Sequence, residues 1–331
     1  MCRLFTKIML ALAMLLAIQI AAVESSADHH APHLGADVNI CPRPLLDEVG
    51  QYGKGRIEVI KEWVAKSPHK HPNCVDSHQG HSMLSYLASG HMNETMLKVL
   101  YELRPDVNFH NKINLSSLVA PTVTMKGDTA MMTAADNPYI ASDTMIFYLL
   151  AYGANPDLQE DVTGETTMIM VSEPGNHFNV VDPKGQYESS TEYRKLMFLR
   201  LFGADPNIQG WTQNKAPWKG NYAFTAFHQL AYNRTGVDIL SPFKLLIEPE
   251  TVLTWEHFWA QIPKSYTHKH VQLTRQQFEA MKTRMPKFNP RTLCLKDGSG
   301  RNVFEVLKTS HSGWNKQPLI EYLSRFTTCS E

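Results

Sequence analysis

The histidines of one short stretch come closest to a pattern that could do chemistry. The sequence "SPHKHPNCVDSHQGH" holds His69, His71, His78 and His81, with Cys74 among them. A metal site needs converging ligands, and two close histidine pairs could supply them. The stretch is also rich in turn residues, and Cys74 has an alternative use in a disulfide. We therefore favour solvated or capping histidines over a metal site.

A second metal hypothesis concerns Asp28-His29-His30. If the chain is cut after Ala27, the new amino group and a histidine at the third position could hold copper(II) through square-planar nitrogens. This hypothesis depends on the position of the cut, so the expected protein has no metal-binding residue and no cofactor.

Motifs of nucleophilic or phosphate chemistry are not found in the sequence. It has no Gly-x-Ser-x-Gly elbow, phosphate-binding glycine loop, zinc-protease helix or paired-cysteine metal motif. Scattered acids and bases such as Glu256 and His257 form no recognisable catalytic pattern. We therefore expect a non-enzymatic protein with no catalytic residue.

The first 27 residues read as a signal peptide. Arg3 and Lys7 precede an apolar run over residues 8–23, and Ser25-Ser26-Ala27 fits a small-x-small cleavage site. The alternative is an uncleaved anchor, but the run is shorter than the roughly 20 residues of a membrane span. We expect a secreted or periplasmic protein whose mature chain has no span, with residues 28–55 as a flexible leader.

The four cysteines of the mature chain predict two disulfides. An even cysteine count in an exported protein is typical of disulfide bonding. Three pairings are possible, and we expect Cys41 with Cys74 and Cys294 with Cys329, because each pair lies in one terminal part of the chain. Each bridge would close a loop of about 35 residues and contribute about 3 kcal/mol. The alternative is four free, buried thiols.

Composition limits the classes of partner. The chain has 331 residues, 43% of them hydrophobic, and its formal net charge is zero. Such a chain can bury a sizeable core, and its charge balance argues against nucleic acid and acidic membranes as broad electrostatic partners.

A repeated phrase reveals the organisation of the chain. "LLAYGANPDLQ" begins at Leu149, and "LRLFGADPNIQ" begins at Leu199. Before the first copy, Thr129 can cap a short helix, and a second apolar stripe of helical spacing follows. Gly153 then supplies a left-handed residue that ends the helix, and Pro156 prevents its continuation. Helix, turn, helix and extended turn form a unit that cannot bury its apolar face alone.

The same order of signals recurs along the chain. It predicts further pairs of helices that begin after the capping residues Ser82, Thr166, Thr225 and Asn302. These segments resemble ankyrin repeats, whose units carry Gly-x-Thr-Pro-Leu-His-x-Ala and later Leu-Leu-x-x-Gly-Ala-Asp. Only "TAFH" at residues 225–228 keeps both the threonine and the histidine. The resemblance implies that His228 hydrogen-bonds between neighbouring turns, and that the fold is an all-α solenoid of stacked helix-turn-helix units.

Long insertions separate this chain from a regular repeat of about 33 residues. They must leave the stack as surface loops, because the helix pairs still have to pack together. Aromatic residues in two of these loops are candidate anchors for a protein partner: Phe178, Tyr187, Trp211, Trp218 and Tyr222. The alternative is that these rings fold back over the stack as a local cover.

The segments outside the clearest repeats are also predicted to be helical. A helix over residues 56–65 would cap the repeats of residues 56–250. Residues 251–331 would hold a diverged helical repeat, in which Thr274-x-x-Gln277 is a capping box, and a C-terminal capping repeat.

By analogy with ankyrin-type proteins, we expect a monomeric scaffold that binds a protein partner through its concave face and inserted loops. The alternatives are a metal-binding protein or enzyme that uses the histidine-rich segments, and a secreted host-directed effector.

Overall fold

Described here is a computed structural model of the chain. It describes residues 40–41, 45, 57–66, 72–76, 81–90, 93–111, 127–136, 142–161, 163–173, 190–211, 223–232, 240–261, 271, 273–310 and 315–329. The expected signal peptide and most of the leader lie outside these residues. All described residues belong to one compact unit, residues 39–331.

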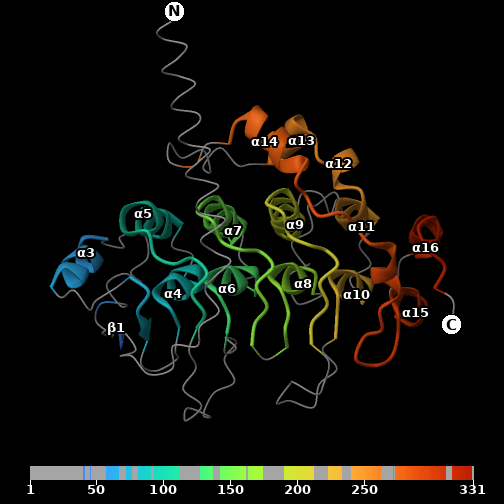
Figure 1. Cartoon of the computed structure of the whole chain (residues 1–331), viewed down its shortest axis with the longest axis horizontal. Coiled ribbons are helices and arrows are strands. Elements are labelled where there is room, and N and C mark those ends of the chain that lie inside the picture. Colours follow the sequence, from blue (N-terminus) through green and yellow to red (C-terminus); the bar gives the residue numbers. More distant parts are fainter. Residues whose placement is uncertain are drawn as a thin grey trace, which may run out of the picture. The chain divides into compact units, whose positions relative to one another are not determined.

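Helices form most of the described chain, as expected for an all-α protein, and they lie in two parallel layers (Figure 1). The first layer consists of α4 (Met83–Ser89), α6 (Ala130–Asp136), α8 (Thr167–Val171), α10 (Ala226–Ala231) and α15 (Val303–Thr309). The second layer consists of α3 (Ile57–Ala65), α5 (Asn93–Leu103), α7 (Ser142–Ala151), α9 (Thr191–Leu201) and α11 (Leu240–Ile247). Helix α16 (Gln317–Ser324) follows α15 at the C-terminal end.

Contacts between helices run along each layer and across it. In the first layer α4 contacts α6, α6 contacts α8, α8 contacts α10 and α10 contacts α15; in the second, α3, α5, α7, α9 and α11 follow one another in the same way. Within each pair, α4 contacts α5, α6 contacts α7, α8 contacts α9 and α10 contacts α11. The helices that follow Thr129, Thr166 and Thr225 are therefore stacked as neighbours, as the sequence predicts.

The expected capping residues begin the first-layer helices. The side-chain oxygens of Thr166, Thr225 and Asn302 accept hydrogen bonds from backbone N–H groups three residues on, at 3.4, 3.3 and 3.0 Å. Ser82 and Thr129 accept equivalent bonds at 3.1 and 3.3 Å. Each cap satisfies a backbone donor that a helix leaves without a partner in its first turn.

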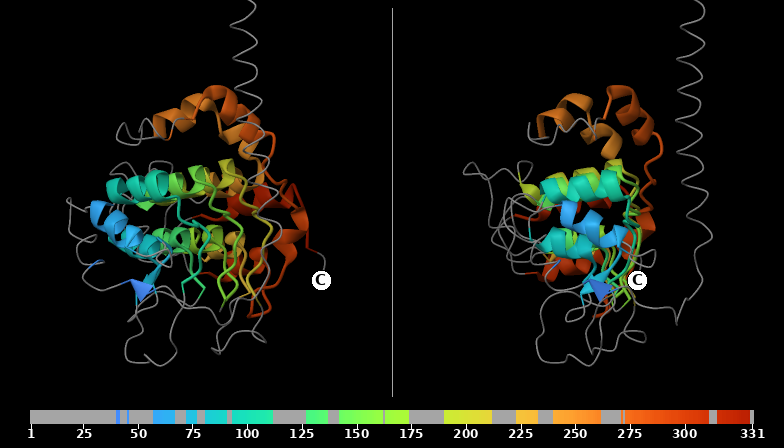
Figure 2. Two further views of the ribbon diagram at one scale, coloured as in Figure 1. Left: turned by 60° about the vertical axis from the view of Figure 1, so that its left-hand side comes forward. Right: turned by 90° about the vertical axis from the view of Figure 1, so that its left-hand side faces the viewer.

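A third group of helices lies on the second layer (Figures 1 and 2). It consists of α12 (Pro249–Val252), α13 (Trp255–Gln261) and α14 (Arg275–Lys282), and α14 contacts α9. Thr274 and Gln277 form the predicted capping box. Because α10 contacts α15 directly, this segment is not a further stacked pair between them, which differs from the expected diverged repeat. Its sequence is helical, but its apolar face, with Phe258 and Phe278 fully buried, covers α9.

Disulfides join the two expected cysteine pairs. Cys41 is bonded to Cys74 and Cys294 to Cys329, with Cα–Cα distances of 5.1 and 5.3 Å. Near the first, the strands β1 (Ile40–Cys41) and β2 (Val75–Asp76) pair in parallel. Near the second, the 3-10 helix η4 (Pro290–Cys294) precedes α15. Within the described part of the chain, no helix combines the length and the apolar composition needed to cross a membrane.

Candidate functional site

The repeated phrase builds two nearly identical turns at the end of α7 and of α9. Gly153 and Gly203 have φ angles of +90° and +95°. The N–H of Ala154 donates to the carbonyl of Leu149 at 3.0 Å, and that of Ala204 donates to Leu199 at 2.9 Å. A left-handed glycine followed by such bonds is the usual way to end a helix and satisfy its last carbonyls. Both turns thus leave their helices in the same direction.

The first Asn or Asp after Gly-Ala stabilises its own turn. The Oδ1 of Asn155 accepts the N–H of Asp157 at 3.0 Å, and that of Asp205 accepts the N–H of Asn207 at 2.9 Å. Asp106 does the same for Asn108 at 2.9 Å. A side chain that bonds the backbone two residues on is a common device of tight turns. These residues therefore fix the shape of each turn.

The second Asn or Asp binds the next turn along the stack. The Oδ1 of Asn108 accepts the N–H of Asn155 at 2.7 Å, and that of Asp157 accepts the N–H of Asp205 at 2.8 Å. Asn207 continues the series, since it accepts the N–H of Asn289 at 2.8 Å. We call this series the turn ladder. Its last step joins Asn207 to Asn289, 82 residues further along the chain, so the turn at Asn289 is the next in the row.

A glutamine two residues further on makes a second connection of the same kind. The Nε2 of Gln159 donates to the carbonyls of Gly164 at 2.6 Å and Gln209 at 3.1 Å. The Nε2 of Gln209 donates to Ala223 at 2.7 Å and Lys296 at 2.8 Å. Each glutamine thus hydrogen-bonds its own hairpin and the adjacent one, and we call Gln159 and Gln209 the ladder glutamines.

The hairpins that follow the turns lie side by side, and we call them the finger row. Their bases are closed by backbone bonds between residues 111 and 128, 160 and 165, 210 and 224, and 297 and 301. The N–H of Trp211 also donates to the carbonyl of Thr163 at 2.7 Å, which joins two fingers directly. Backbone and side chains together therefore fix the spacing of the fingers, which is what a rigid binding surface needs.

Two carboxylates, those of Glu160 and Glu165, lie close together in the central part of the finger row. The fully buried Glu160 carboxylate accepts bonds from the Thr163 N–H and hydroxyl, and from the Gly164 N–H at 2.7 Å. The pKa of Glu165 is raised to about 7, first by burial and then by the carboxylates of Glu173 and Glu160. This part of the finger row therefore carries more negative charge above neutral pH than below it.

Asp157 in the turn ladder also has a raised pKa, of about 6. Burial is the main cause; the bond from the Asp205 N–H opposes it, and the Asp205 carboxylate adds to it. The equivalent positions hold Asn108 and Asn207, which accept the same bond without a charge.

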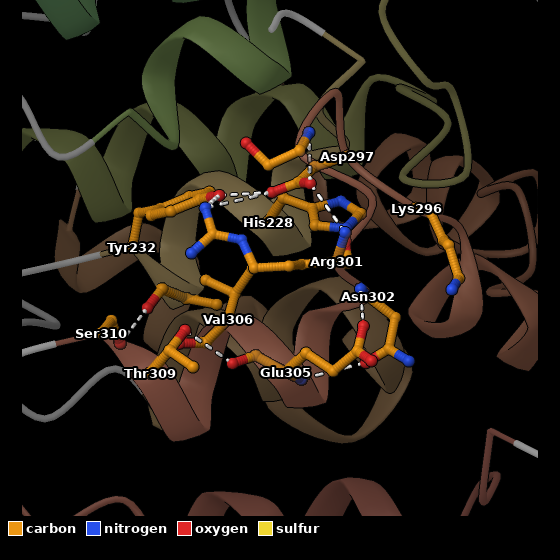
Figure 3. A network of polar contacts seen from close by, with 12 residues as sticks. His228, Tyr232, Lys296, Asp297, Arg301, Asn302, Glu305, Val306, Thr309 and Ser310 are labelled. Carbon is orange, nitrogen blue, oxygen red and sulfur yellow. Dashed lines mark hydrogen bonds and ion pairs between the residues drawn. The ribbon is translucent and has the colours of Figure 1, made fainter. Parts of the chain in front are cut away.

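The last finger contains a compact polar network (Figure 3). The Oδ1 of Asp297 accepts the N–H groups of Ser299 at 2.8 Å and Arg301 at 2.9 Å, and its other oxygen accepts the hydroxyl of Tyr232. The Arg301 guanidinium bonds the same hydroxyl and lies 5.2 Å from the centre of the Tyr232 ring. Because the hydroxyl is buried and faces Asp297, the pKa of Tyr232 is raised to about 12.

His228 connects this finger to α10. Its Nδ1 accepts the Thr225 N–H at 3.2 Å, so its Nε2 carries the proton and donates to the Arg301 carbonyl at 3.2 Å. Burial lowers the pKa of His228. The histidine therefore bonds two neighbouring units, as the resemblance implies, and keeps a neutral ring.

The sequence-predicted partner residues are only partly within the described chain. Phe178, Tyr187, Trp218 and Tyr222 lie outside it. Trp211 is half-buried, and a Cβ added to Gly164 would come within 2.4 Å of its ring. The Trp211 ring therefore lies against the adjacent finger, which agrees with the local cover that was the alternative.

Other residues considered for chemistry are separated by the fold. Glu256 pairs with Arg275 at 3.2 Å, whereas the His257 ring lies 6.2 Å from the centre of the Tyr193 ring. His69, His71, His78 and the Asp28-His29-His30 segment lie outside the described residues. Among those described, no three His, Cys, Asp or Glu side chains are grouped so that they could hold a metal ion.

The ladder glutamines were missed in the sequence analysis. A signal was present, because Gln159 and Gln209 occupy the same place in the two copies of the phrase. The buried charges of α9 were also missed: Glu192, Lys195 and Arg200 are at most 4% exposed. Nothing local distinguishes them from ordinary charges on the solvent face of a helix.

Comparisons with known proteins give little further information. No family model matches the sequence, and no curated protein matches it. A similar chain occurs in the solved structure of the Bd0816 predatory endopeptidase from Bdellovibrio bacteriovorus in complex with the immunity protein Bd3460. The similarity covers 86% of this chain and 98% of that chain, at 16% sequence identity and a TM-score of 0.43.

Proposed function

We propose that the protein is an exported, non-enzymatic scaffold of the ankyrin-repeat type that binds a protein partner through its finger row. The observation that carries this proposal is that two sets of hydrogen bonds connect successive fingers. One set is the turn ladder, and the other is made by the ladder glutamines. They hold successive fingers at fixed spacing, and stacked-repeat proteins use extended surfaces of this kind for binding. The ankyrin-type solenoid is itself part of the proposal, supported by the two layers of paired helices.

The finger row offers side chains that suit a protein partner. Asp161 and Lys296 are exposed, and Glu165, Trp211 and Arg301 are partly exposed. Tryptophan and arginine are enriched among residues that dominate binding energy at protein interfaces. The acidic finger with Asp161 and Glu165 and the exposed Lys296 at the last finger would also orient a partner of complementary charge.

Export is supported by the disulfides and by the sequence of the first 27 residues. Structural disulfides persist in oxidising compartments and are rare in the cytosol. We place the mature protein in the periplasm or outside the cell. Fractionation of a native producer would test this, and recovery in the cytosol with the first 27 residues intact would contradict it.

A crosslinking pull-down of the mature protein from its own compartment tests the binding surface. One variant carries Trp211→Ala and a Gly/Ser linker in place of residues 212–222, so that Gln209 and Gly210 remain in the row. A control variant carries Glu94→Ala and Lys98→Ala, two exposed positions on α5. We expect a partner that the wild type and the control recover and the finger variant does not. Equal recovery by all three proteins would contradict the assignment.

A further inference from the structure

Four exposed cations follow one another between α14 and the last finger without an intervening acid. They are Arg284, Lys287, Arg291 and Lys296, and we call them the basic strip. The cations on either side are neutralised locally, since Lys282 pairs with Glu279 at 3.9 Å and Arg301 with Asp297 at 3.6 Å. None of the four has an ion-pair partner among the residues that the structure describes. In a chain of zero net charge, four exposed cations within thirteen residues and no acid among them form a positively charged stretch of the surface.

The backbone of the strip is fixed from the inside. The Nη2 of Arg200 donates to the Pro286 carbonyl at 3.1 Å, and the Nδ2 of Asn207 donates to the Lys287 carbonyl at 2.9 Å. The Asn207 Oδ1 also accepts the Thr292 hydroxyl at 2.9 Å. The backbone carbonyls are thus held against the stack, and the charged side chains are exposed. In Figure 3 the Lys296 side chain extends away from the polar network of the last finger.

The apolar residues between the cations face the core. The Phe288 ring lies 5.2 Å from that of Phe227 and 6.0 Å from that of Phe326, and Leu293 is fully buried. Single-stranded nucleic acids are usually bound by exposed aromatic rings next to cations. Binding to a membrane surface usually adds inserted apolar side chains. The strip offers charge and hydrogen-bond donors but neither of these.

From this geometry, we propose that the basic strip is a binding surface for an acidic segment of a protein partner. Arginine guanidinium groups bind carboxylates through paired hydrogen bonds, and lysines add charge between them. The surface is distinct from the finger row except at Lys296, and the proposal does not depend on the proposed function. Loss of one binding activity would leave the other to be measured.

Fluorescence anisotropy with a labelled octaglutamate peptide tests the proposal. The strip variant carries Arg284→Gln, Lys287→Gln, Arg291→Gln and Lys296→Gln. The control variant also removes four exposed cations: Lys66→Gln, Lys98→Gln, Arg104→Gln and Lys308→Gln. We expect the strip variant to bind the peptide about tenfold more weakly than the wild type, and the control less than twofold more weakly. Because the cations are exposed, an increase from 50 to 300 mM salt should weaken wild-type binding by a similar factor.

Two further measurements make the outcome decisive. Circular dichroism should show the same melting curve for the strip variant and the wild type. The charge-retaining variant Arg284→Lys, Arg291→Lys should bind more tightly than the strip variant and more weakly than the wild type, because lysine keeps the charge but not the paired hydrogen bonds. The proposal is overturned by a wild type that does not bind the peptide at 50 mM salt, or by equal losses in strip and control variants. Tighter binding of an eight-residue thymidine oligonucleotide, or of vesicles with anionic lipid, would overturn it in favour of that ligand class.

Discussion

Helices α7 and α9 occupy equivalent places in two successive pairs, and each leads into the same kind of turn. Counting back from Gly153 and Gly203, Met145 corresponds to Lys195 and Leu150 to Arg200. All four side chains are buried. In α7 they are apolar. In α9 they are charged, and Arg200 donates to the carbonyls of Ala204 at 2.6 Å and Pro286 at 3.1 Å.

This difference teaches how a repeat array carries an added segment. The turn after each helix is the same, so the array is continuous through both. The charged residues of α9 bond backbone groups outside the pair: Lys195 donates to the Ala135 carbonyl at 3.0 Å, and Arg200 bonds the linker after α14. Burial lowers the pKa of Lys195 to about 8 and that of Arg200 to about 10. A buried charge is costly without such partners.

The largest effect should come from Arg200→Ala, compared with Leu150→Ala. We expect Arg200→Ala to lower the free energy of unfolding by about 3 to 4 kcal/mol, because packing and two charged hydrogen bonds are lost. Leu150→Ala should cost about 2 to 3 kcal/mol through its cavity. Urea denaturation measures both values.

Hydrogen exchange then separates the two helices. Arg200→Ala should increase exchange in α13, α14 and residues 283–289, and Leu150→Ala should not. If both variants change the exchange of this segment equally, Arg200 does not attach it to the stack.

A smaller difference is expected at the second Asn or Asp of each turn. Asn207 bonds Asn289, Thr292 and the Lys287 carbonyl, whereas Asp157 bonds only the N–H of Asp205 in the next turn. We expect Asn207→Ala to cost about 2 kcal/mol and Asp157→Ala less than about 1 kcal/mol at neutral pH. Thermal unfolding followed by circular dichroism would measure the difference, and equal losses would contradict the asymmetry of the ladder.

The helix-ending glycines should behave alike. A Cβ added to Gly153 or Gly203 meets nothing within 4 Å, so only the positive φ opposes it. Gly153→Ala and Gly203→Ala should each cost about 1 to 2 kcal/mol. Urea denaturation measures both losses of free energy. If they differ by more than about 0.5 kcal/mol, which is the usual error for independent sites, the two turns are not equivalent.

The smallest effect is expected from Asp157→Asn, which makes the first copy of the turn resemble the second. The folded pKa of about 6 lies above the ordinary value of 3.8. The folded protein therefore binds the proton more tightly, and stability falls as the pH rises from about 4 to about 6. Asparagine keeps the bond to Asp205 without this cost. A difference of about 2 pKa units corresponds to about 3 kcal/mol, and solvent screening of the partly exposed Asp157 side chain reduces this to about 1 kcal/mol. The variant should therefore be about 1 kcal/mol more stable than the wild type at pH 8 and equal to it near pH 4, as measured by urea denaturation at both values.

Local sequence signals predicted the parts of the fold that local chemistry determines. Thr129, Thr166 and Thr225 begin helices because a hydroxyl caps backbone donors, and Gly153 ends one because it accepts a positive φ. The cysteine pairing followed from position in the chain. The ladder contacts were not predicted, because Gln159 bonds a carbonyl fifty residues away. The position of α12 to α14 also depends on distant contacts, since their apolar face would suit a stacked pair equally well.

The two disulfides lie near opposite ends of the described chain, and this has a mechanical consequence. If the protein were pulled at Ile40 and Cys329, tension would pass through the sulfur atoms from Cys41 to Cys74 and from Cys329 to Cys294. Helices α3, α15 and α16 would bear no load, and extension would begin only between residues 74 and 294. The helices at the two ends of the stack would thus be the last that force could peel away.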